Sequence, residues 1–461
     1  MKNKIIVSCF FSAVFSFAAV QMVQAATKKG WTAGGADRYW DTSGNFKNIS
    51  ATKDGYYLRS GEGSALDATK RTILFNKVNE ESVRVTIESA GTSDDIPYVF
   101  LADTDDYGLT LKADFEVGNY KVGHLHVKRG IYQGYALKVG NGSNTGNVPL
   151  VIGGDENKAK MKLTYSSAAV LLNKGTTKVL ANGTLESTGR FKVGTTSGQT
   201  GELLVDGGTV NVSGDYFSVG ATSGGTGKVT INSGNVSHTC SEDIPIGDHG
   251  SGSVTVKAGG KLANSGSSKG IRVGNNSAAT LDVQGGEVEL TKGALQFSSA
   301  AGDGSVTITE GGKITIPKIT CSTGNGTGTI TINGGTIRAT QDSVEFIPAD
   351  DKLNVYVGAA GATFDTDGHA ITIGENLQNK SGEAGTVTFK GGGVITLLVA
   401  GNYTGLTTVE VGTTLIVPTP SSIGAGLVVA VPDKTPANGT YTILSCSGEG
   451  VFAEAVLDGV A

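Results

Sequence analysis

The residues of this chain that could carry acid–base chemistry gather in one short stretch. His238, Glu242, Asp243 and Asp248 lie close together, and Arg272 follows Asp248 after about one period of the repeat described below. A pair of carboxyl groups with a nearby base is what cleavage of a polysaccharide needs. These five residues are therefore weak catalytic candidates. The other interpretation is a solvated turn, because Asp, His and Gly are common turn residues.

A second acidic stretch resembles part of a calcium-binding loop. Asp103 and Asp105 begin it, and Asp114 stands at the twelfth position, where such loops place their last ligand. Tyr107 occupies a ligand position, and no helical pattern flanks the stretch. The same Asp-Thr-Asp form recurs at 365–367. Asp103, Asp105 and Asp114 are thus weak metal-ligand candidates, a repeated turn explains them equally well, and no cofactor is predicted.

The beginning of the chain has the pattern of a secretory signal. Lys2 and Lys4 precede an uncharged apolar stretch at 5–20, and small residues at 23–25 give a cleavage site after Ala25. No later segment is apolar and long enough to span a membrane as a helix. We therefore expect a secreted or cell-surface protein.

Charge and cysteine content narrow the choice of partners. The 461 residues carry a formal charge of −5, and only 17% are charged, so no basic surface points to nucleic acid. Removal of the signal leaves Cys240, Cys321 and Cys446, an odd number without metal-site spacing. The pairing of these cysteines stays open.

The middle of the chain repeats itself. A glycine that closes a tight turn recurs at one constant spacing, and only the last step is slightly shorter. An alternating aliphatic strand precedes each of these turns, and one aliphatic residue follows two positions later. The six turn glycines are Gly208, Gly234, Gly260, Gly286, Gly312 and Gly335.

This repeat favours a coil over a meander of hairpins. Equivalent residues recur in every unit, and winding the units into one coil stacks such residues about 4.8 Å apart as continuous ladders. A meander would pair neighbouring strands antiparallel. We therefore predict an all-β fold, a parallel β-helix (β-solenoid) with about 26 residues per turn. The crossover preference of parallel strands makes it right-handed.

The period divides the chain after the signal into three parts. Residues 131–417 carry the β-helix repeats. Residues 26–130 have a poor period and are expected to form an N-terminal cap with irregular first turns, or else a separate small β-domain. Residues 418–461 form a closing β segment. Terminal units of a solenoid are atypical because they close the open end of the core.

One part of the repeat resembles a known family. Residues 361–417 contain Asn402-Tyr403-Thr404-Gly405-Leu406-Thr407-Thr408-Val409 and several Gly-rich strand–turn units. This segment resembles the autotransporter-associated β-strand repeat of bacterial passenger proteins, with Tyr403 one residue closer to Asn402 than usual. The resemblance implies a surface β-helix of the pectin-lyase-like type, often adhesive or structural and usually without a catalytic centre. It also implies an outer-membrane anchor or translocator, which we expect to lie outside this chain.

Two functions from different classes follow. The leading one is an exported, non-catalytic β-helix that serves as a surface structural or adhesive element. Its outward Thr, Ser and Asn side chains would bind a surface glycan or a host or matrix ligand. The alternative is a secreted polysaccharide lyase or hydrolase on the same scaffold, using the carboxylates around residue 243.

Overall fold

The computed structural model describes most of the chain between residues 71 and 418. The described ranges are 28–31, 39–41, 46–48, 55–60, 71–82, 84–89, 97–118, 124–140, 149–266, 269–297, 300–321, 324–418, 423, 426–430, 444–446 and 455–458. The predicted signal at 1–25 lies outside them. Within these ranges no helix has the length and apolar character needed to cross a membrane.

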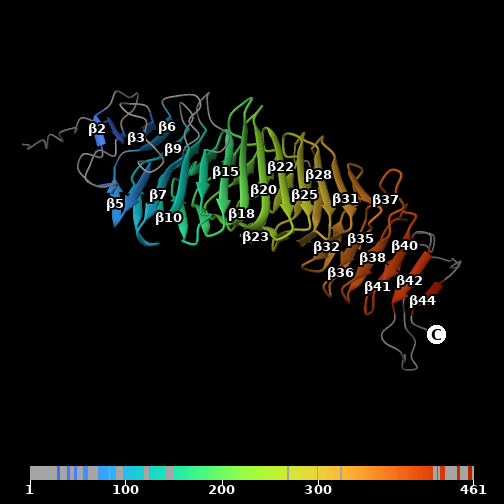
Figure 1. The fold of residues 1–461 in the computed structure, drawn as a ribbon. Coiled ribbons are helices and arrows are strands. Elements are labelled where there is room, and N and C mark those ends of the chain that lie inside the picture. Colours follow the sequence, from blue (N-terminus) through green and yellow to red (C-terminus); the bar gives the residue numbers. More distant parts are fainter. Residues whose placement is uncertain are drawn as a thin grey trace, which may run out of the picture.

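The described chain is a parallel β-solenoid, as predicted, and its strands stack along one long axis (Figure 1). A typical turn has three strands: β22 (Ser251–Lys257), β23 (Gly260–Asn264) and β24 (Ile271–Val273). Each pairs parallel with its counterpart in the next turn, β25 (Ala279–Gln284), β26 (Glu287–Leu290) and β27 (Leu295–Phe297). We call the three resulting stacks the first, second and third face.

The first and second faces share three long strands that bend from one face to the other: β10 (Leu125–Gly134), β18 (Thr200–Val212) and β20 (Thr226–His238). The other strands of the first face are β4 (Thr72–Phe75), β7 (Tyr98–Ala102), β12 (Leu150–Ile152), β15 (Gly175–Leu180), β28 (Gly304–Thr309), β31 (Gly328–Asn333), β34 (Leu353–Val357) and β37 (Leu377–Asn379). Those of the second face are β5 (Val78–Glu81), β8 (Gly108–Leu111), β13 (Ala159–Leu163), β16 (Gly183–Ser187), β29 (Lys313–Ile316), β32 (Gly335–Ala339), β35 (Ala362–Asp365), β38 (Val387–Lys390), β40 (Leu406–Val409), β42 (Gly426–Ala430) and β44 (Ala455–Asp458).

The third face consists mostly of short strands. They are β1 (Lys28–Trp31), β2 (Phe46–Asn48), β3 (Gly55–Ser60), β6 (Val85–Ser89), β9 (Phe115–Val117), β11 (Leu137–Val139), β14 (Val170–Leu172), β17 (Phe191–Val193), β19 (Phe217–Val219), β21 (Ile244–Ile246) and β30 (Ile319–Cys321). A separate five-stranded sheet follows: β33 (Ser343–Ile347), β36 (Ala370–Ile373), β39 (Val394–Leu397), β41 (Thr414–Val417) and β43 (Leu444–Cys446).

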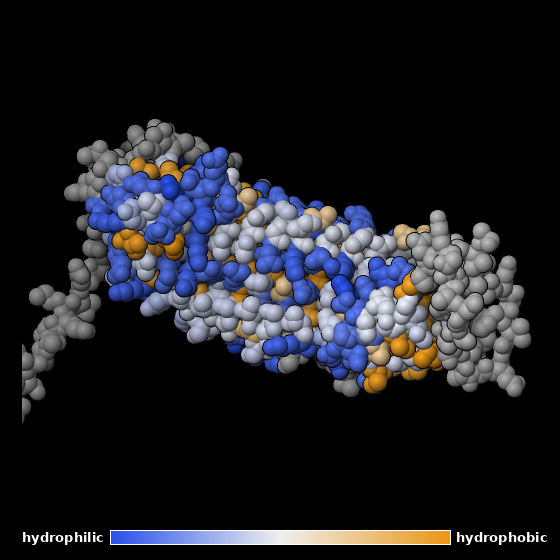
Figure 2. Space-filling view, turned by 90° about the horizontal axis from the view of Figure 1, so that it is seen from below, coloured by the Kyte–Doolittle hydropathy of each residue, from blue (hydrophilic) through white to orange (hydrophobic). Residues whose placement is uncertain are grey.

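The core is the stack of aliphatic columns that the repeat predicted. On the second face one column is in register from strand to strand, and each of its side chains is fully buried. Its members are Val210, Val236, Leu262, Val288, Ile314 and Ile337. Alternate residues of each strand point outward, and on the face seen in Figure 2 hydrophilic and neutral surface prevails over the middle turns.

The paired glycines of the corners have separate roles. Gly311 has φ of 76°, a conformation that side chains rarely adopt, and open space lies where its Cβ would be. Gly312 has no such φ, but a Cβ there would lie 2.4 Å from the carbonyl oxygen of Val283 in the preceding turn. The first glycine lets the chain turn, and the second lets consecutive turns approach each other.

Two parts of the coil depart from the central period. Strands β4 to β9, within the segment expected to be the cap, pair parallel with the turns that follow. Most residues before 71 are outside the described ranges, so the cap stays a prediction. Near the other end the turn shortens, because Val387 pairs with Thr407, a smaller step along the chain than in the central turns. No first-face strand lies between β38 and β40, which are both fully described, so this turn has two strands.

Candidate functional site

The predicted acid–base residues lie at the two ends of short strand β21. Asp243 precedes the strand, Asp248 follows it, and Arg272 is the middle residue of the neighbouring strand β24. Pro245 pairs with Arg272. Arg272 therefore contacts Asp243 directly and is linked to Asp248 only through Asn275.

Hydrogen bonds link these residues into one chain across three turns. The Nε atom of Arg272 donates to a carboxylate oxygen of Asp243, and its Nη1 donates to Asn275 Oδ1 at 3.2 Å. Asn275 Nδ2 donates to Asp248 Oδ1 at 2.9 Å, and Ser218 Oγ donates to Asp248 Oδ2 at 2.7 Å. Asp243 is fully buried. Both carboxylates thus accept hydrogen bonds from protein groups and join neighbouring turns.

Glu242 belongs to a different pair, on the outer surface of the same corner. Its Oε2 lies 2.6 Å from Lys269 Nζ, and this hydrogen bond holds the pKa of Glu242 below its ordinary value. One turn earlier Arg190 and Asp215 form an ion pair of 2.9 Å. We did not single out Asp215 from the sequence. The sequence feature that could have identified Asp215 is a residue of opposite charge about one turn of the coil away. Both of these ion pairs have that spacing.

His238 is buried beside a thiol. Its Nε2 lies 2.9 Å from Cys240 Sγ and 3.1 Å from the carbonyl oxygen of Asp215. Burial lowers the pKa of His238, against the raising effect of the Asp215 carbonyl and the Asn264 side chain. Burial likewise raises the pKa of Cys240. Both shifts favour the uncharged forms, so this pair is suited to packing rather than to nucleophilic attack.

The second described cysteine is also held as a thiol. Burial, followed by the charges of Asp350 and Glu375, raises the pKa of Cys321 to about 12. Cys240 and Cys321 are both free thiols. The surroundings of Cys446 fall outside what the structure describes.

We expect the buried His238 to make the protein less stable in mild acid. A folded-state pKa below the unfolded value of about 6.5 means that the unfolded chain binds the proton more readily. This contribution to stability is complete above pH 6.5 and declines as the pH falls towards the folded pKa, by at most about 1.4 kcal/mol per pH unit. Urea unfolding at pH 7.5, 6.5 and 5.5 measures the decline.

His238→Gln should flatten the decline between pH 7.5 and 5.5. Equal pH dependence in wild type and His238→Gln would show that the buried imidazole is not responsible.

The three predicted metal ligands take separate partners. Asp105 pairs with Arg129 at 2.9 Å, and Asp114 pairs with Lys138 at 2.6 Å. Asp103 accepts a hydrogen bond from the Tyr39 hydroxyl at 3.2 Å. Within the described ranges no three His, Cys, Asp or Glu side chains stand close enough to hold a metal ion.

Part of the family-like motif faces the interior of the corner, whereas Asn402, Thr404 and Leu406 are exposed. Tyr403 is buried, and its hydroxyl lies 2.6 Å from the hydroxyl of buried Thr407. The backbone nitrogen of Gly405 donates to Gly385 of the preceding turn at 2.9 Å. Thr404 and Asn379 join side chains at 2.8 Å. The buried residues of the motif therefore help to close a turn.

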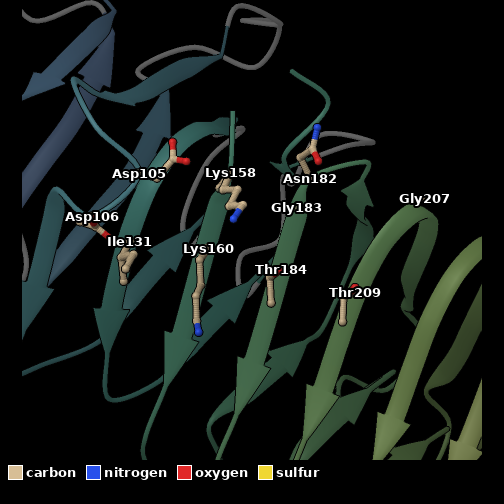
Figure 3. A pocket seen from close by; sticks show the side chains of 11 residues that line it. Asp105, Asp106, Ile131, Lys158, Lys160, Asn182, Gly183, Thr184, Gly207 and Thr209 are labelled. Atoms are coloured by element: carbon tan, nitrogen blue, oxygen red, sulfur yellow. The ribbon is translucent and has the colours of Figure 1, made fainter. Parts of the chain in front are cut away.

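A groove lies on the second face, well away from the family-like motif along the coil. It has a volume of about 580 Å³ and runs across neighbouring strands at the corner between the first and second faces (Figure 3). Two acidic, two basic, one amide and two hydroxyl side chains line it, together with Ile131. They are Asp105, Asp106, Lys158, Lys160, Asn182, Thr184 and Thr209.

A second groove, of about 410 Å³, lies on the first face and is lined by small side chains. Ser253, Thr280, Ser305 and Thr329 occupy one register position in four consecutive strands. The carboxylate among its lining residues, Asp303, accepts hydrogen bonds from the backbone nitrogen and the hydroxyl of Thr327. This surface is a row of hydroxyl groups at strand spacing.

No protein-family model, curated protein or solved structure matches this chain.

Proposed function

We propose that this protein is an exported, non-catalytic β-helix that serves as a structural or adhesive element at the cell surface. The observation that carries the proposal is that the polar side chains of the candidate site bind other groups of the protein. In the stretch richest in acid–base groups, Glu242 and Asp243 each bind a cation of the protein, and Asp248 accepts two side-chain hydrogen bonds. These contacts join one turn to the next, which is the work of a scaffold.

Export is part of the same proposal. The Lys2 and Lys4 pair, the apolar stretch behind it and the small residues up to Ala25 support a signal that is removed. The resemblance of residues 361–417 to the repeats of autotransporter passengers supports surface display. The structural role of Tyr403 and Thr407 in closing a turn agrees with a motif that is kept for folding.

Adhesion is supported by the long outward faces of the coil. The two grooves offer hydroxyl, amide and charged groups to a ligand, and both cross several turns. Extended solenoid surfaces of this kind suit the recognition of long ligands. A glycan on a neighbouring surface is the partner we propose.

A panel of polysaccharides separates this proposal from the enzymatic alternative. The chain without residues 1–25 is incubated with acidic and neutral polysaccharides, and released reducing ends and unsaturated products are measured. We expect no product above a heat-treated control. Product release that disappears in Glu242→Gln, a substitution of a half-buried surface carboxylate, would establish an enzyme and refute the proposal.

A further inference from the structure

The groove of the second face contains charged side chains that form no ion pair within the described part of the protein. Arg129 pairs with Asp105, and Lys160 pairs with Glu186 at 2.7 Å. Among the described residues no ion pair involves Lys158 or Asp106, and both are exposed at the groove. The groove therefore presents one ammonium and one carboxylate group that are free to meet a ligand.

The floor of the groove adds polar groups at a regular spacing. Ile131, Lys160, Thr184 and Thr209 pair in register on four neighbouring strands, which lie about 4.8 Å apart. Asn182 stands at the corner above them, and its Nδ2 donates to the carbonyl oxygen of Asp155 at 2.9 Å. This leaves the amide oxygen of Asn182 as an acceptor. Figure 3 shows Lys158 between Asp105 and Asn182.

The backbone of this face offers little to a peptide. Strand β13 pairs with β10 on one side and with β16 on the other, and β16 pairs in turn with β18. Peptides that bind sheets usually add a strand to a free edge, and these strands have none. A ligand here must bind through side chains, which favours a molecule rich in hydroxyl groups.

We propose that this groove binds a glycan carrying a sugar carboxylate. Lys158 binds the carboxylate, Asp106 and the amide oxygen of Asn182 accept hydrogen bonds from sugar hydroxyls, and Thr184 and Thr209 exchange hydrogen bonds with further hydroxyls along the chain. The aliphatic side chain of Ile131 contacts a carbon–hydrogen face of a sugar ring. The inference names the ligand class of the adhesive surface and rests on the proposed function.

Calorimetric titration of the chain without residues 1–25 tests this assignment. The probes are sialyllactose, which carries a terminal sugar acid, a hyaluronan tetrasaccharide, which carries internal ones, and lactose, which carries none. We expect at least one acidic probe to bind, with lactose at least tenfold weaker. Which acidic probe binds decides between a terminal and an internal sugar acid. Binding should weaken as salt is raised, because the Lys158 contact is exposed.

Variants give the decisive comparison. Lys158→Ala should weaken binding of the acidic probe at least tenfold. Lys318→Ala, which removes another exposed lysine far along the chain, should leave it unchanged. Failure of both acidic probes to bind, or equal binding by Lys158→Ala and wild type, would overturn the assignment.

The glycan-binding test and the test of the proposed function can fail independently of each other. A chain that is displayed on cells but binds no acidic glycan refutes the groove assignment alone. A chain that stays inside cells but loses binding in Lys158→Ala keeps the groove and refutes the surface role.

Discussion

Arg272→Ala is expected to lower the free energy of unfolding by about 3 kcal/mol, because it leaves the buried carboxylate of Asp243 without its cation. The guanidinium also binds Asn275, which in turn binds Asp248, so its loss loosens contacts between two neighbouring turns. Equilibrium unfolding in urea, followed by circular dichroism, measures the change.

Two further variants show whether buried charge is the cause. Adding Asp243→Asn to Arg272→Ala removes the unpaired charge and should recover part of the lost stability. Lys269→Ala breaks the exposed pair with Glu242 and should leave the unfolding midpoint near that of wild type. A double variant no more stable than Arg272→Ala would mean that the loss has another origin.

Ile308→Ala is expected to cost about 2–5 kcal/mol. Its side chain is fully buried and stands in register between Val283 and Ile332 of the adjoining turns, so truncation leaves a cavity in a continuous column. Because a solenoid turn contacts only its neighbours, the loss of stability should be local. Hydrogen exchange should show lost protection in β25, β28 and β31 and native protection in β13 and β16.

The control for this prediction is an outward residue of the next strand. Thr331→Ala removes a side chain from the solvent face of β31 and should change stability by less than about 0.5 kcal/mol. If Thr331→Ala costs as much stability as Ile308→Ala, packing of the inward side chains is not what stabilises the turn. If hydrogen-exchange protection falls equally in β13, the loss of stability is not confined to the adjoining turns.

Sequence periodicity is sufficient to predict the columns of the core. Val210 and Val236 recur with the period because each turn must bury the same position, and the parallel register confirms this. The shorter turn before Thr407 escaped prediction, because the Gly-rich corners continue there while a first-face strand is lost. Glycine marks where a turn ends but does not tell how many strands lie between two corners.

The candidate site was predicted in part. Spacing by about one turn places Arg272 in the same network as Asp248, but Arg272 binds Asp243 directly and is linked to Asp248 through Asn275. The burial of Asp243 depends on packing around the corner, which no spacing reveals. The groove at Lys158 was missed for a similar reason. Its residues come from five turns of unequal corner length, and its free charges are apparent only once the partners of Asp105 and Lys160 are known.

The most direct test of the account locates the protein in its native cells and determines where its chain begins. Intact and broken cells are labelled with an antibody to the folded β-helix, and the purified protein is sequenced from its amino end. We predict labelling of intact cells and a chain that begins at Ala26. A chain that begins at Met1 and is labelled only after the cells are broken would contradict the exported, surface-held function.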